Sequence, residues 1–299
     1  MLTTVSRSRC STATIPNVTE PAPFQRVAVV GLGVMGGSFA RALTATREAP
    51  EVRGWCPNAD ERRAALDAGA VMTAPEALRE ALHWADLVVL ATPLPVVCDL
   101  ISGIADNGLA NEATIMDVAG LKEPVARAAA AAGLSNRFVG AHPMAGSEAS
   151  GFAASRPDLF DDAIVWVVAE PEADARTTRV EALWRSLGGN PVRTSASEHD
   201  RLMSLASQLP QLIANSLAAA LNAADIGHDD LGPGGRDMTR LAASNPEMWA
   251  PLFEDAHPDL IGTLRTMAAS LGHMADDLES GDIDALVSLM KQTQTWRTS

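Results

Sequence analysis

The amino-acid sequence predicts an α/β protein with a doubly wound parallel sheet followed by an all-helical domain. Short β-branched and apolar runs alternate with helical patterns up to about residue 195, and long Ala- and Leu-rich helical patterns follow. Alternating strands and helices fold into a parallel sheet covered on both faces. We therefore divide the 299 residues into a flexible tail at 1–24, a sheet domain at 25–195 and a helical domain at 196–299.

A glycine pattern follows the first predicted strand, Val27–Val30, and opens a helical pattern. It consists of Gly31, Leu32, Gly33, Val34, Met35 and Gly36. Strand, G-x-G-x-x-G and helix in this order are the dinucleotide fingerprint. Gly31 should make the tight turn, Gly33 should leave room for a pyrophosphate, and Gly36 should let helix and strand pack closely. Residues 25–195 are thus a predicted Rossmann-type dinucleotide-binding domain.

The remaining elements follow from periodicity. Strands are predicted at 51–56, 85–93, 113–120, 137–142, 163–169 and 191–194. Helices are predicted at 122–132, 174–188, 198–225, 246–255, 257–280 and 283–296. The last helices are apolar enough to need burial beyond one chain, which predicts a substrate and dimerisation domain at 196–299 and a homodimer.

Composition narrows the classes of partner and the compartment. The formal charge of −14 argues against nucleic acid, whose phosphates need a basic face. No apolar run reaches the roughly 18 residues of a membrane span, and residues 1–24 lack the apolar core of a signal peptide. Cys10, Cys56 and Cys98 are too scattered for a disulfide framework or zinc site, so we expect no metal and a cytoplasmic protein.

The end of the second strand bears on the choice of nicotinamide cofactor. An Asp or Glu there would bind the ribose 2′-hydroxyl of NAD, but the chain reads Cys56-Pro57-Asn58. Arg62 follows within reach of a 2′-phosphate, which favours NADP slightly over NAD, although it could also lie on a solvated helix face. Thr92 ends the next strand, either beside the nicotinamide or as a helix N-cap.

Three clusters can carry chemistry. His142 ends a predicted strand before a Pro and a Gly-rich turn, where a general base would meet substrate. Polar residues interrupt an apolar helix near Pro210, either facing a ligand or joining helices; these are Ser207, Gln208 and Gln211. Arg240 follows a glycine loop and can bind a carboxylate in bidentate fashion or pair with Asp237 or Glu148.

Five segments together resemble the prephenate and arogenate dehydrogenases, the oxidative decarboxylases of tyrosine biosynthesis. They are VGLGVMGGS (30–38), DVAGLK (117–122), VGAHPMAGSE (139–148), HDRLMSLASQLPQ (199–211) and GRDMTRLAASNPEMW (235–249). The resemblance implies that His142 is the catalytic histidine and that Arg240 binds the ring carboxylate. It further implies gating or pocket roles for Ser147, Glu148, Ser207, Gln208, Gln211, Asp237 and Trp249, the last reaching across the dimer.

The chain departs from the family pattern at three positions. Many members have Ser at Gly120, where it supports the catalytic histidine and the cofactor, so here we expect water or backbone as the histidine's partner. Many members have His at Gln208 and Gln211. Neutral amides suit the ammonium of arogenate better than the keto acid of prephenate, which gives a hypothesis for substrate choice.

The resemblance implies that neutral His142 accepts the C4 hydroxyl proton while hydride leaves C4 and CO₂ leaves C1. One alternative is a β-hydroxyacid dehydrogenase, but those enzymes use a lysine on the helical domain, where this chain has only Lys291. Another is a non-catalytic nucleotide-sensing protein, for which Gly120 and the two glutamines would be signs of decay.

Overall fold

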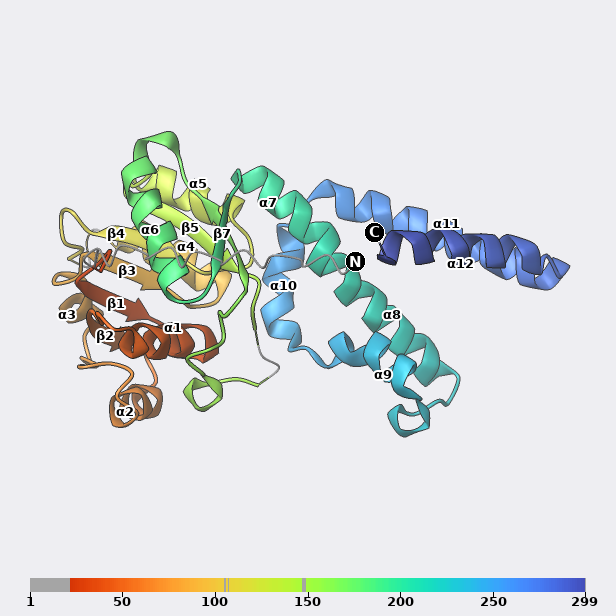
Figure 1. The fold of residues 1–299 in the computed structure, drawn as a ribbon, viewed down its shortest axis with the longest axis horizontal. Helices are drawn as coiled ribbons and strands as arrows, with labels where there is room; N and C mark the ends of the chain where they lie inside the picture. Colours follow the sequence, from red (N-terminus) through yellow and green to blue (C-terminus); the bar gives the residue numbers. More distant parts are fainter. Residues whose placement is uncertain (1–21, 105, 107, 147–148, 299) are drawn as a thin grey trace, which may run out of the picture.

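The computed structural model describes residues 22–104, 106, 108–146 and 149–298. A single seven-stranded sheet forms the centre of the first domain, with strand order β2-β1-β3-β4-β5-β6-β7 (Figure 1). Its strands are β1 (Arg26–Val30), β2 (Glu51–Trp55), β3 (Leu87–Leu90), β4 (Thr114–Asp117), β5 (Phe138–Pro143), β6 (Ile164–Val168) and β7 (Asn190–Arg193). The predicted α/β class is confirmed, and every predicted strand lies within a few residues of an observed one.

Helices cover both faces of the sheet. They are α1 (Val34–Ala45), α2 (Ala59–Asp67), α3 (Leu78–Leu82), α4 (Leu94–Gly103), α5 (Glu123–Ala131) and α6 (Asp174–Ser186). Successive strand residues point to opposite faces, so β1 contributes Val27 and Val29 to the core under α1 and α6. Its Ala28 and Val30 belong to the core under α3, α4 and α5.

The sheet is not parallel throughout. β1 to β5 pair in parallel, but β6 runs antiparallel to β5, and His142 lies opposite Trp166. A parallel pair needs a crossover connection, usually a helix. Between β5 and β6 the described chain offers only the single 3₁₀ turn η1 (Phe152–Ala154), whereas α6 connects the parallel pair β6 and β7. The all-parallel sheet predicted from the sequence is therefore wrong at this edge.

The chain enters the core just before β1. Phe24, predicted to end the flexible tail, is 1% exposed, and the Arg179 guanidinium lies 4.2 Å from its ring centroid. The end of α6 packs in a similar aromatic cluster, where Trp184 makes edge contacts with Phe39 and Phe160 at 5.2 Å. These contacts fix α1 and α6 against the sheet.

The second domain is entirely helical, as predicted. Its elements are α7 (Ala196–Met203), the π-turn η3 (Ser204–Gln208), α8 (Leu209–Ala223), η4 (His228–Asp230), α9 (Pro233–Thr239), η5 (Arg240–Ala243), α10 (Pro246–Glu254), α11 (Pro258–Ser280) and α12 (Ile283–Thr298). The single helix predicted at 198–225 is interrupted just before Pro210 by this wider π-turn, a feature found often at functional sites. Before, within and after this turn, His199, Ser204, Gln208 and Gln211 are all buried.

The outer helices expose much apolar surface. α11 and α12 form a long pair that extends away from the sheet (Figure 1). Of α11 only Leu260 is buried, and α12 has no buried residue. Large exposed apolar side chains on these two helices are Ile261, Leu271, Leu278, Ile283, Val287, Met290 and Trp296. Within the described residues, no helix combines the length and the apolar character that crossing a bilayer requires.

Candidate functional site

The glycine turn after β1 has the geometry that a dinucleotide needs. Gly31 has φ +97°, and a Cβ there would lie 2.4 Å from the carbonyl oxygen of Ala91. A Cβ on Gly36 would lie 1.8 Å from the carbonyl oxygen of Gly31, so helix α1 packs directly on the turn. A Cβ on Gly33, the N-cap of α1, would meet no atom within 4 Å. The open side of this turn at a helix N-terminus fits a pyrophosphate.

The neighbouring predicted cofactor residues divide into buried and accessible ones. Leu32 is buried in the core, whereas Val34 and Met35 are half-exposed in the first turn of α1. The Thr92 hydroxyl is buried and has no hydrogen-bond partner. Pro93, not Thr92, precedes α4 as N-cap, without a side-chain bond, so the alternative N-cap role for Thr92 is wrong. An unpaired hydroxyl at the carboxyl end of β3 suits a ligand group.

The end of β2 contains no carboxylate directed at the expected ribose position. The Cys56 thiol is buried against the Asn58 carbonyl, and burial raises its pKa. Asn58 caps α2 by accepting from the backbone N–H groups of Asp60 and Glu61. Arg62 folds back over the turn, its Nη1 2.6 Å from the carbonyl oxygen of Cys56. A guanidinium therefore covers the turn that ends β2.

A strap formed by residues 151–156 links the cofactor helices to the segment after β5. The Glu61 carboxylate accepts from the Phe152 backbone N–H at 2.6 Å, so this acid of α2 is engaged away from the β2 turn. On α1, Arg41 donates to the Ser155 hydroxyl at 2.8 Å, and Ser38 accepts from the backbone N–H of Arg156. No sequence pattern predicted this strap.

His142 lies at the carboxyl end of β5 and contacts a second histidine from the helical domain. Its Nδ1 lies 2.9 Å from Nε2 of His199 on α7, with the rings edge to face at 5.1 Å. Ser195 caps α7 by accepting from the Glu198 backbone N–H, which sets the start of the helix one turn before His199. Our expectation that water or backbone would be the partner of His142 is therefore wrong.

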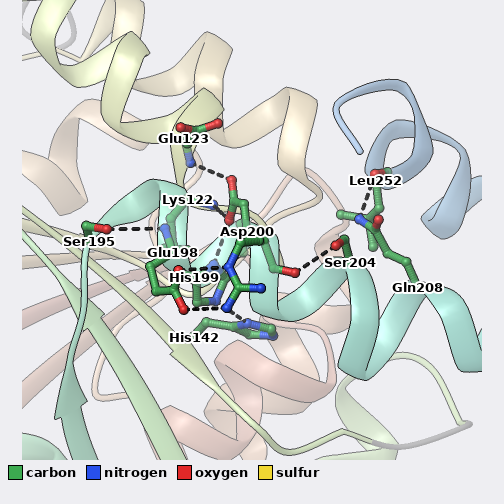
Figure 2. A network of polar contacts seen from close by, with 12 residues as sticks. Lys122, Glu123, His142, Ser195, Glu198, His199, Asp200, Ser204, Gln208 and Leu252 are labelled. Atoms are coloured by element: carbon green, nitrogen blue, oxygen red, sulfur yellow. Dashed lines mark hydrogen bonds and ion pairs between the residues drawn. The ribbon is translucent and has the colours of Figure 1, made fainter. Parts of the chain in front are cut away.

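Asp200 completes this contact on the far side of His199. Its Oδ1 lies 2.6 Å from Nδ1 of His199, and its carboxylate also accepts the backbone N–H groups of Lys122 and Glu123 at 2.8 Å each (Figure 2). His199 is 0% and Asp200 2% exposed. The row His142–His199–Asp200 thus crosses from the sheet domain into the helical domain and ends at the N-terminus of α5.

A buried ion pair holds the strand ends beside this row. Lys122 Nζ contacts the Asp117 carboxylate and donates to the carbonyl oxygen of Ala141 at 2.8 Å. Asp117 also accepts from the backbone N–H of Ala119. Both charged groups are almost fully buried, so each compensates the other's loss of hydration. The pair fixes the residue that directly precedes His142.

The surroundings of His142 favour its neutral form. Burial lowers its pKa well below the ordinary 6.5, and repulsion by His199 and Lys122 acts in the same direction. Burial also lowers the pKa of His199, although the hydrogen bond to Asp200 opposes that effect. At pH values above that lowered pKa the imidazole of His142 is in its neutral form, the form that can accept a proton.

Gly120 and Gln208 both lie next to Leu252 of α10. A Cβ on Gly120 would lie 3.5 Å from the side chain of Leu252, so the space that a serine would occupy is next to α10. Gln208 donates its amide N–H to the Leu252 carbonyl at 2.9 Å. On α8, Gln211 donates to the Leu241 carbonyl at 2.7 Å, beside Arg240. Both glutamines therefore hold segments that carry predicted substrate residues.

The other predicted substrate residues are more dispersed. Asp237 and Arg240 are exposed on α9 and η5, which lie along α8. Trp249 on α10 stacks on Phe253, with its buried indole N–H unpartnered. Ser207 is half-buried in the π-turn. Ser147 and Glu148 lie outside the described residues. In the part of the chain that the structure describes, no three His, Cys, Asp or Glu side chains are grouped as metal ligands.

Comparison with known proteins decides the family. The family model of the prephenate dehydrogenase nucleotide-binding domain matches residues 39–193, and that of the prephenate dehydrogenase dimerization domain matches residues 195–292. The chain belongs to the prephenate dehydrogenase family. The match to a nucleotide-binding domain supports an NAD(P)-type cofactor and agrees with the Rossmann-like sheet described above.

Similar members of the prephenate dehydrogenase family cover most of the chain. A prephenate dehydrogenase of Bacillus subtilis is 26% identical over 91% of this chain and 75% of its own length. A cyclohexadienyl dehydrogenase of Zymomonas mobilis is 28% identical over 92% and 95%. The crystal structure of prephenate dehydrogenase from A. aeolicus with hydroxyphenyl propionate and NAD+ superposes with a TM-score of 0.82 at 26% identity, over 92% of this chain and 97% of that one.

Sequence reasoning missed four residues around His142, namely Asp117, Lys122, His199 and Asp200. The sequence contained one hint of a functional role for two of them, because His199 and Asp200 are polar or charged and lie directly after the predicted start of an amphipathic helix. Their burial could not be read from the helical period, since it depends on contacts with the sheet domain, where His199 meets His142 and Asp200 meets the start of α5.

Proposed function

We propose that this chain catalyses the NAD(P)-dependent oxidative decarboxylation of a cyclohexadienyl substrate, prephenate or arogenate, in tyrosine biosynthesis. The observation that carries the proposal is a neutral histidine, His142, at the carboxyl end of a parallel strand in a family nucleotide-binding domain. The similarity to a prephenate dehydrogenase and a cyclohexadienyl dehydrogenase supports the same reaction class. The cofactor would lie over Gly33 and against Thr92, and when bound it would supply a hydride acceptor.

The protein's own residues would act on the proton and the carboxylates. Neutral His142 would accept the C4 hydroxyl proton through Nε2, while the C1 carboxylate leaves as CO₂ and its bonding electrons complete the aromatic ring. Arg240 would hold the ring carboxylate with its guanidinium, and Trp249 would line the pocket. The gating or pocket roles of Ser147, Glu148, Ser207 and Asp237 remain predictions from the family resemblance.

Turnover assays with prephenate and arogenate, each with NAD and NADP, test this proposal. We expect CO₂ release and reduced cofactor in equal amounts from at least one pairing. A β-hydroxyacid dehydrogenase would instead oxidise a hydroxyacid without decarboxylation. Such an enzyme needs a lysine on the helical domain, and the only lysine in that part of the sequence is Lys291, which is exposed on α12. A nucleotide-sensing protein would bind cofactor without turnover.

The two buried glutamines favour arogenate over prephenate. Gln211 uses both amide N–H groups, on the Leu241 carbonyl and on Asn215 Oδ1 at 3.3 Å. The Oε1 atoms of Gln208 and Gln211 are buried without a partner. An ammonium group offers N–H donors to such oxygens, whereas a keto group offers none.

We expect a higher kcat/KM for arogenate than for prephenate. Gln211→Leu should lower the ratio of the two kcat/KM values about tenfold, the value of one hydrogen bond to a charged group. The ratio cancels any general loss caused by releasing Leu241. A wild-type enzyme that strongly prefers prephenate would contradict this part of the proposal.

For the cofactor, the absence of a carboxylate at the β2 turn and the position of Arg62 favour NADP. Cys56→Asp should shift the preference towards NAD by repelling the 2′-phosphate. Arg62→Gln should raise the Kd of NADP about tenfold and leave that of NAD unchanged, with Arg63→Gln as the exposed control. Titration of each variant with both cofactors measures the effect, and a wild type that binds NAD more tightly would count against this interpretation.

The exposed apolar faces of α11 and α12, together with the match to a dimerization domain, support a homodimer. Light scattering at micromolar concentration should give twice the mass of one chain. Leu271→Asp, on an exposed apolar position of α11, should shift the population towards monomer because the interface would bury an unpaired charge. A wild type of monomeric mass would contradict the proposal.

A further inference from the structure

We propose that His199 and Asp200 are positioning residues that fix the tautomer of His142. The inference rests on the proposed function, in which His142 is the general base. It concerns two buried side chains of α7 that reach the base from the other domain.

The proton positions follow from the hydrogen-bond partners, beginning at Asp200. Its two oxygens accept backbone N–H groups from Lys122 and Glu123, which can only donate, so the carboxylate acts as an acceptor. Nδ1 of His199, 2.6 Å from Oδ1, must then carry the proton. In the neutral ring Nε2 of His199 is left as an acceptor.

The same logic assigns the tautomer of His142. Its Nδ1 lies 2.9 Å from the acceptor Nε2 of His199 and must donate a proton to it. The lone pair of neutral His142 is thereby on Nε2, the nitrogen turned away from this contact. Which nitrogen of a histidine is basic is set by the hydrogen bond that the other nitrogen makes. The row thus holds the base in its proton-accepting form.

Charges on every neighbouring element affect the protonated state of His142. Lys122, at the start of α5, disfavours a positive imidazolium, and Asp117 on β4 partly offsets Lys122 by pairing with it. Asp200 on α7 contributes the carboxylate in line with the row. When Nε2 of His142 accepts the substrate proton, the proton on Nδ1 of His142 either stays there or moves to Nε2 of His199. The proton on Nδ1 of His199 stays in its hydrogen bond to Asp200.

Asp200→Asn is the sharpest variant. With its NH₂ group in the place of Oδ1, the asparagine gives up the contact with the Lys122 backbone N–H and donates to Nδ1 of His199, which places the His199 proton on Nε2 and makes Nδ1 of His142 an acceptor. His142 would then carry its proton on Nε2 and could not act as the base, so we expect kcat to fall about 10²–10⁴-fold. The KM and the cofactor Kd should change little, since neither residue is placed against substrate or cofactor.

Because Asp200 also holds the start of α5, a second variant leaves that contact intact. His199→Gln keeps Asp200 and its backbone partners, and we expect kcat to fall about 10–10²-fold, with the acid limb of the pH–rate profile displaced. Glu198→Gln is the matched control, because this exposed neighbour on the same helix pairs with Arg201. Its kcat and acid limb should equal those of the wild type.

A measurement independent of turnover reads the tautomers directly. In ¹⁵N-histidine-labelled protein, long-range ¹H–¹⁵N spectra should show Nδ1–H for both His142 and His199, and Nε2–H for both in Asp200→Asn. The resonances are identified by their loss in His142→Asn and His199→Gln. Wild-type protein without the Nδ1–H tautomers, or an Asp200→Asn enzyme that shows the Nε2–H tautomers and keeps full kcat, would overturn the proposal. Wild-type protein with the Nδ1–H tautomers but no turnover of either substrate would overturn the proposed function and leave this assignment of tautomers supported.

Discussion

His142→Asn is expected to lower kcat by about 10²–10⁴-fold while the substrate KM barely changes. The asparagine amide can still donate to Nε2 of His199, but no atom remains to accept the hydroxyl proton, and this range is the usual contribution of general base catalysis. Steady-state kinetics of both enzymes give the two parameters. His83→Asn, an exposed histidine of the same domain, is the control and should behave as the wild type.

The pH–rate profile gives a second test of the same residue. The base works in its neutral form, so the wild-type kcat/KM should fall as the pH drops through the pKa of His142. Since burial, His199 and Lys122 lower this pKa well below 6.5, the fall should occur below pH 6.5. The acid limb should vanish in His142→Asn. Near-full kcat with the limb intact would mean that another group is the base.

Arg240→Gln is expected to raise the KM about 10–100-fold and to lower kcat much less. A carboxylate contact that is present in both ground and transition states is uniform binding, and a hydrogen bond between charged groups contributes about 1.5–3 kcal/mol. Arg236→Gln, four residues earlier on exposed α9, removes the same charge as a control. An equal loss of kcat in Arg240→Gln would instead indicate that Arg240 acts mainly in the transition state.

The sequence was sufficient for the parts of the fold that depend on local patterns. The apolar runs predicted the strands, and the G-x-G-x-x-G order predicted a turn in which a Cβ on Gly31 or Gly36 would clash with backbone. The antiparallel β6 was not predicted, because an apolar run such as Ile164–Val168 reads the same in either direction. The direction depends on the length and path of the connection, which a local pattern does not contain.

Single residues of the site could be predicted from the sequence, but the contacts between them could not. His142 was identified by its place at a strand end, but its partner His199 lies 57 positions later and meets it only when the two domains pack. The π-turn at Ser204–Gln208 likewise shifts which helix positions are buried, so a regular 3.6-residue period misplaces them. Such contacts are properties of the domain interface rather than of any segment.

That His142 and Asp200 lie on opposite sides of the domain boundary limits how this enzyme can be rebuilt. The row of hydrogen bonds from β5 to α7 returns to α5 through Lys122 and Glu123, so each half supplies part of the proton-accepting unit. A chimera that joins residues up to 194 to the helical half of a distant homologue would keep its cofactor turn. Its His142 would be held in the proton-accepting tautomer only if the foreign helix supplied residues equivalent to His199 and Asp200. Recombination between relatives should therefore succeed only where the halves have diverged together.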